Sequence, residues 1–219
     1  MKQNDLPVLN PEPRWPAMCA LLAVGGTFLA LPKNLVPGLN WAPIVLIVIL
    51  GGIAWAAHTS RLHYLSHILS HVVNIIITIY LVTALALLIR ALPHHTETSV
   101  QLLTSAALLW ITNIIVFGSW YWRLDAGGPH KRERRPEHTD GAFLFPQMAL
   151  SGDIRGSLGL QGWSPQFLDY LFLAFSTSTA LSSADTFPLN RWAKVMMMAQ
   201  SLISLSIIAL LAARSVNIL

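Results

Sequence analysis

The sequence predicts an all-α integral membrane protein with five transmembrane helices and a re-entrant segment before the last of them. Of the 219 residues, 54% are hydrophobic and only 11% are charged, and the mean hydropathy is +0.55. A soluble domain carries about 25% charged residues, so too few charges are present to cover a water-exposed surface. The apolar residues also form long runs without the strict alternation of barrel strands, which predicts helices.

Five apolar runs approach the length of about 20 residues that crosses a hydrocarbon core of about 30 Å. Three of them form a predicted membrane segment over residues 17–92, after a polar, proline-containing tail at residues 1–16. The other two belong to a C-terminal module over residues 100–219. The runs cover residues 17–31, 41–57, 72–92, 100–122 and 193–213.

The C-terminal module contains a long basic loop at residues 124–164, a re-entrant segment at 165–188 and a final helix at 191–215. Residues 167–175 of the re-entrant segment are apolar and aromatic, whereas the following residues are rich in hydroxyls. This change predicts a half-helix that stops inside the membrane and returns as extended backbone. Such backbone is tolerated only where protein or a water-filled cavity covers it.

A second topology has six spans. If residues 167–184 cross the membrane completely, both chain termini lie on the same side. Asp169 would then be a carboxylate inside the membrane near one interface, where it is costly unless it is paired.

Within either set of spans, polar side chains such as Gln200 and Ser204 are expected to hydrogen-bond between helices.

Residues 179–194 resemble the pore loop of two-helix potassium channels. Thr179 corresponds to a filter threonine, Leu181 to the filter valine, Asp185 to the aspartate after the filter, and residues 187–188 to the exit. The resemblance implies a pore helix, a filter and an inner helix in that order. It also implies a symmetric homo-oligomer, a tetramer, that conducts a monovalent cation.

Both filter glycines are absent, because Ser182, Ser183 and Ala184 occupy their place. Glycine allows the positive φ angles that point successive carbonyls at the ion, so a pathway here would be lined by hydroxyls and a carboxylate instead. The alternative is a re-entrant loop whose hydroxyls only cap backbone groups and stabilise the fold. The candidate pathway residues are Thr177, Thr179, Ser182, Ser183 and Asp185.

The whole chain is also similar to a bacterial family of multi-pass membrane proteins without an assigned function. The similarity rests on F-L-F-P-Q at residues 143–147, D-Y-L-F-L-A-F at 169–175 and A-A-R-S-V-N-I-L at 212–219. It implies a multi-pass protein of bacterial origin, and the prediction of helices rather than barrel strands then favours the inner membrane.

Four basic residues follow the fourth apolar run, and a solvated loop carrying them is expected to contact anionic lipid headgroups of the bilayer. Nucleic-acid binding is disfavoured because no aromatic interleaving or known binding module accompanies these charges. The distribution of lysine and arginine places this loop in the cytoplasm, whereas the pore loop of potassium channels faces outward. The four residues are Lys131, Arg132, Arg134 and Arg135.

His63, His67 and His71 recur every four residues and would share one helix face. Imidazoles at this spacing can bind zinc or copper, but no Cys, Asp or Glu neighbours them, so a polar stretch at the membrane interface is expected. The sequence lacks H-E-x-x-H, a phosphate-binding glycine loop and G-x-S-x-G. We therefore expect a non-enzymatic protein without a cofactor, either channel-like or a structural or accessory membrane protein.

Overall fold

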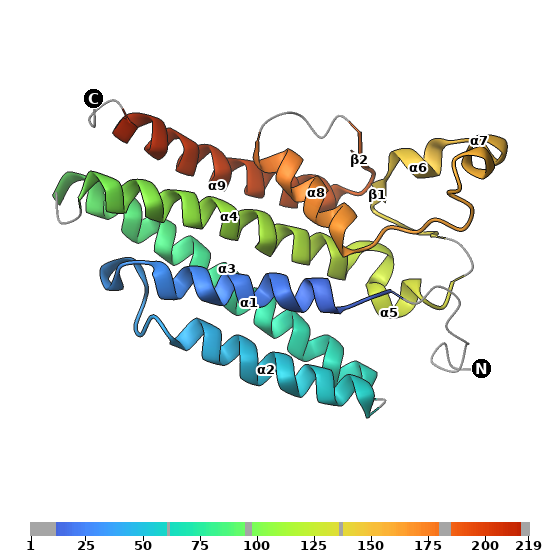
Figure 1. Ribbon diagram of the computed structural model, residues 1–219, viewed down its shortest axis with the longest axis horizontal. Coiled ribbons are helices and arrows are strands. Elements are labelled where there is room, and N and C mark those ends of the chain that lie inside the picture. The colour runs from blue at the N-terminus through green and yellow to red at the C-terminus, as the bar shows by residue number, and fades with distance from the viewer. Residues whose placement is uncertain (1–11, 61, 95–97, 136–137, 180–184, 216–219) are drawn as a thin grey trace. The chain divides into compact units, whose positions relative to one another are not determined.

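The computed structural model describes residues 12–60, 62–94, 98–135, 138–179 and 185–215, and this part of the chain is mostly helical (Figure 1). The longer helices are α1 (Trp15–Ala30), α2 (Ala42–Thr59), α3 (His63–His94), α4 (Ser99–Leu124), α8 (Phe167–Ser178) and α9 (Arg191–Ser215). Shorter elements are the 3-10 turns η2 (Lys33–Leu35) and η3 (Asp125–Gly127), helices α5 (Pro129–Arg132), α6 (Pro146–Ala149) and α7 (Gly152–Ser157), and strands β1 (Phe143–Leu144) and β2 (Phe187–Pro188).

Within the described part of the chain, three helical stretches are long and apolar enough to cross a membrane: Tyr64–Ala91, Val100–Arg132 and Arg191–Ala212. Trp15–Ala30, Ala42–Ala57 and Phe167–Ser178 are apolar but shorter. Large apolar side chains on α9, including Val195 and Leu202, are exposed, which suits contact with lipid. The prediction of a helical, membrane-compatible protein is therefore confirmed.

The chain divides into two compact units, and the division falls within α1, α4 and α9. One unit comprises residues 17–116 and 202–219. Here α2 packs along α3 (Figure 1). A Cβ atom on Gly25 of α1 would lie 2.9 Å from Ile44 of α2, so glycine allows these two helices to approach closely.

The other unit comprises residues 1–16 and 117–201, and it contains α8 together with the adjoining parts of α4 and α9. A Cβ atom on Gly118 of α4 would lie 3.1 Å from Cα of Leu171, so the backbones of α4 and α8 are in close contact. Strand β2, which follows α8, pairs antiparallel with β1, which precedes it, and Phe143 lies opposite Pro188. The chain that leaves α8 is thus tied to the chain that enters it.

Candidate functional site

Two groups of polar contacts lie in the unit formed by residues 1–16 and 117–201. The first, called here the hydroxyl end of α8, consists of Thr177, Ser178 and Thr179 with Gln200. The second, called here the charge cluster, consists of Glu12, Asp125, Arg132, His138 and Tyr170.

Gln200 connects three helices at the hydroxyl end of α8. Its side chain is buried, and its Nε2 donates hydrogen bonds to the carbonyl of Ala174 at 2.7 Å and to Oγ of Ser178 at 2.8 Å. Its Oε1 accepts a hydrogen bond from the hydroxyl of Tyr121 at 2.5 Å. One amide on α9 therefore contacts both α4 and α8, which confirms the predicted interhelical role of Gln200.

The candidate pathway residues are only partly within the described chain. Thr177 is buried and its hydroxyl donates to the carbonyl of Leu173 at 2.8 Å. The hydroxyl of Thr179 donates to backbone carbonyls of the last turn of α8. Asp185 is exposed on the returning chain, and Ser182 and Ser183 lie outside the described residues. The two threonine hydroxyls thus bond to the backbone of α8 itself.

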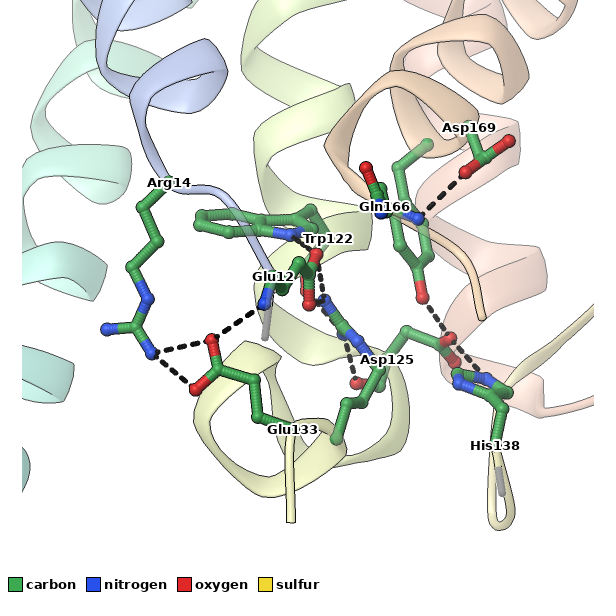
Figure 2. A network of polar contacts seen from close by, with 10 residues as sticks. Glu12, Arg14, Trp122, Asp125, Glu133, His138, Gln166 and Asp169 are labelled. Carbon is green, nitrogen blue, oxygen red and sulfur yellow. Dashed lines mark hydrogen bonds and ion pairs between the residues drawn. The ribbon is translucent and has the colours of Figure 1, made fainter. Parts of the chain in front are cut away.

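Asp125 is the buried centre of the charge cluster, directly after α4 (Figure 2). Its Oδ2 accepts a hydrogen bond from the hydroxyl of Tyr170 at 2.6 Å and lies 3.1 Å from Nε2 of His138. Its Oδ1 accepts the backbone N–H of Ala142. One carboxylate therefore joins the end of α4, α8 and the loop before β1.

Arg132 is the buried cation of the charge cluster. Its Nη2 lies 3.0 Å from both carboxylate oxygens of Glu12, and its Nη1 donates to the carbonyls of Trp122 and Asp125 at 2.8 Å. The guanidinium also lies 5.1 Å from the ring centroid of Tyr170, within the range of a cation–π contact. The charge of Arg132 is therefore compensated inside the protein.

This burial differs from the solvated position predicted for Arg132, whose side chain is only 4% exposed. The physical cause is a turn at Gly127 and Gly128, whose φ angles of +81° and +90° favour glycine and precede α5. Of the four basic loop residues, Lys131 is exposed. Arg134 contacts His130, and Arg135 lies 3.6 Å from Asp140.

Residues 12–14, at the end of the predicted polar tail, are bound to α5 and the residue after it (Figure 2). Glu12 pairs with Arg132 and accepts a hydrogen bond from the indole N–H of Trp122. Arg14 lies 3.2 Å from Glu133. Burial raises the pKa of Glu12, and the positive charge of Arg132 together with the hydrogen bonds from Trp122 and Arg132 opposes that rise.

Aromatic rings surround the charge cluster. The ring of Phe143 makes edge contacts with the rings of Tyr121, Tyr170 and Trp192 at centroid distances of 5.2, 6.4 and 5.9 Å. Phe145 adds an edge contact with Tyr170 at 5.3 Å. An environment of this kind has a low local dielectric, so interactions between the charges gain strength and unpaired charge becomes costly.

The predicted histidine site lies in the other unit. The rings of His67 and His71 have a centroid separation of 4.3 Å, and Nδ1 of His71 lies 2.9 Å from the carbonyl oxygen of His67. The side chain of His63 lies outside the described set. Among the residues that the structure describes, no group of three potential metal-binding side chains occurs.

Comparisons with protein-family models, curated proteins and solved structures gave no match. The charge cluster was not predicted from the sequence, although two signals point towards it. Asp125 follows the fourth apolar run directly, and the Gly127–Gly128 pair predicts a chain reversal at that position. The charge cluster joins the chain before α1 and the end of α4 to α8 through buried ionic contacts, whereas the hydroxyl end of α8 offers oxygen ligands.

Proposed function

We propose that the chain is a non-enzymatic multi-pass membrane protein of the channel-like type, with five spans and α8 as its re-entrant half-helix. The observation that carries the proposal is the length of α8, which ends after twelve residues while Gln200 holds it against α4 and α9. Twelve residues at 1.5 Å each reach about 18 Å, whereas the hydrocarbon core is about 30 Å thick.

The chemistry of the hydroxyl end of α8 fits a cation pathway. The last carbonyls of a helix carry a partial negative charge, and hydroxyl and carboxylate oxygens are ligands for hard cations. A pathway for a monovalent cation would use Thr177, Thr179, Ser182, Ser183 and Asp185 from each copy of a symmetric oligomer, with four copies as in the channels that the sequence resembles. The proposed location is the inner membrane of a bacterium: the bacterial origin rests on the family resemblance, and the inner membrane on helices rather than barrel strands.

A second function is a structural or accessory role without transport. Specific observations favour it: Ser178 is bonded to Gln200, and the hydroxyls of Thr177 and Thr179 donate to carbonyls of α8. These hydroxyls then stabilise helix ends and helix packing. In that case their removal lowers stability and changes no ion flux.

Cation flux into liposomes separates the two functions. Purified protein is reconstituted, and potassium and sodium flux are measured for the wild type, Asp185→Asn, Ser182→Ala and Ser183→Ala. Asp153→Asn, a change at an exposed acid on α7, is the matched control. The channel proposal predicts flux above that of empty liposomes, reduced several-fold by Asp185→Asn and unchanged by the control. Wild-type flux equal to that of empty liposomes contradicts it and favours the accessory role.

A further inference from the structure

We propose that Arg14 and Arg123 form a binding site for the phosphate group of an anionic phospholipid at the end of α4. Both residues belong to the unit formed by residues 1–16 and 117–201. Each contributes a guanidinium group, whose five N–H donors match the oxygens of a phosphate. The inference goes beyond the proposed function and does not depend on ion conduction.

Arg123, in the last turn of α4, lies against neutral groups. Its Nε is 3.4 Å from Oγ of Ser119, one turn back along the helix, and its guanidinium lies 5.3 Å from the ring centroid of Trp122. The indole N–H of Trp122 donates to Glu12, so the ring that carries the guanidinium is itself held in place. A cation that points back along an apolar helix is costly in a membrane unless an anion accompanies it.

The carboxylates of the charge cluster do not contact Arg123. Glu12 pairs with Arg132. The oxygens of Asp125 contact groups on α8 and on the loop before β1, which are Tyr170, His138 and the N–H of Ala142. Within the described part of the chain, Arg123 therefore has no carboxylate as a direct counter-ion.

Arg14 brings a second guanidinium to the same place. It lies near enough for the positive charges of the two arginines to repel each other. Nη2 of Arg14 lies 3.2 Å from Oε2 of Glu133, and its other Nη atom points away from that carboxylate (Figure 2). One guanidinium can bind a carboxylate and a phosphate oxygen together, because it has five N–H donors. A phosphate between Arg14 and Arg123 replaces their repulsion with attraction to a common anion.

The surroundings of the two arginines favour a lipid as the source of the phosphate. Trp15, the residue after Arg14, is 66% exposed, and tryptophan prefers the headgroup layer of a bilayer. The helical stretch Val100–Arg132, which contains Arg123, is long and apolar enough to cross a membrane. Arginine at the end of such a stretch extends towards the headgroups, where anionic lipids attract it.

Thermal unfolding of the full-length protein in detergent tests the site, with tryptophan fluorescence as the signal. Three probes are added at constant ionic strength: phosphatidylglycerol, diacylglycerol with the same acyl chains, and inorganic phosphate. The rise in unfolding temperature with probe concentration gives the apparent affinity. We expect phosphatidylglycerol to bind about tenfold or more tightly than either other probe, because it alone combines phosphate with apolar chains. Equal affinity for diacylglycerol, which lacks the phosphate, or for inorganic phosphate, which is not a lipid, overturns the proposal.

Two variants test the assignment of the arginines. Arg123→Gln should weaken binding of phosphatidylglycerol by about tenfold, because a hydrogen bond to a charged group is lost. Arg191→Gln, at an exposed arginine that begins α9, is the matched control and should bind like the wild type.

The double variant Arg14→Gln with Glu133→Gln removes the second cation without leaving a buried carboxylate unpaired, and it should also weaken binding. It decides the outcome where Arg123→Gln fails to fold, as judged by circular dichroism. Wild-type affinity in the folded Arg123→Gln protein or in the double variant, or an equal loss in the control, overturns the proposal.

Discussion

The two ends of α8 are held by different chemistry. Near its first turn, Tyr170 bonds to a buried carboxylate that belongs to a cluster with Arg132 and His138. At its last turn, Ser178 bonds to the neutral amide of Gln200. The charged groups lie at the start of α8, next to the loop between α4 and β1. The neutral groups lie at the end of α8, between apolar helices. The difference is what the re-entrant arrangement proposed above requires, in which α8 starts at the margin of the apolar region and ends within it.

The largest expected effect comes from breaking the charged end. Asp125→Ala leaves the hydroxyl of Tyr170, the ring of His138 and the N–H of Ala142 without their acceptor. Removal of one partner from a buried ionic contact costs about 3–5 kcal/mol. Chemical unfolding in detergent, followed by circular dichroism, should show this loss in the free energy of unfolding.

Asp140→Asn is the matched control, because that carboxylate is 83% exposed and pairs with Arg135 at 3.6 Å, and asparagine tolerates the φ of +58° at this position. An exposed ion pair contributes about 0–1 kcal/mol. Equal losses in the free energy of unfolding for the two variants would show that the buried contacts of Asp125 stabilise the fold no more than an exposed ion pair does.

A smaller effect is expected at the neutral end. Gln200→Leu removes both donors and the acceptor that serve Tyr121, Ala174 and Ser178. Unsatisfied neutral groups cost about 1–3 kcal/mol, and interhelical hydrogen bonds in membranes lie towards the lower value. The same unfolding measurement should rank Gln200→Leu below Asp125→Ala, with Gln161→Leu at an exposed position close to the wild type. The opposite ranking contradicts the comparison between the two ends.

The smallest effect on stability is expected where α4 packs against the middle of α8. Gly118→Ala places a Cβ atom 3.1 Å from Cα of Leu171 and 3.3 Å from its Cδ1. Overpacking costs about 1–3 kcal/mol, and the higher helix propensity of alanine offsets up to about 1 kcal/mol of it. We expect a loss of about 1 kcal/mol by the same unfolding measurement. Gly26→Ala in α1, where nothing lies within 4 Å of the added atom, should not destabilise the protein.

The sequence predicted the helices well because their signal is local. The run at residues 100–122 corresponds to α4, and the apolar half-helix at 167–175 corresponds to α8, which continues through the hydroxyl residues to Ser178. The third run was placed at residues 72–92, but α3 begins at His63. The hydropathy pattern did not predict the first turns of α3. The polar residues there can form a helix, but they do not extend the apolar run.

The charge cluster could not be predicted because its partners are distant in sequence. Glu12 and Arg132 are separated by 120 residues, and no local pattern pairs them. A run of basic residues in a loop is solvated in most proteins. The prediction followed this usual case and placed Arg132 at the surface. The glycine turn before α5 redirects this side chain inward, and its effect depends on tertiary contacts.

The most direct test of the account is the membrane sidedness of the two chain segments that flank α8. Single cysteines at Gln161 and Asn190, both exposed, are placed in a Cys19→Ala background and treated with a membrane-impermeant thiol reagent before and after permeabilisation. The re-entrant arrangement predicts that both positions react from the same side. Reaction from opposite sides would show that α8 and the residues after it cross the membrane, which contradicts the five-span proposal and supports six spans.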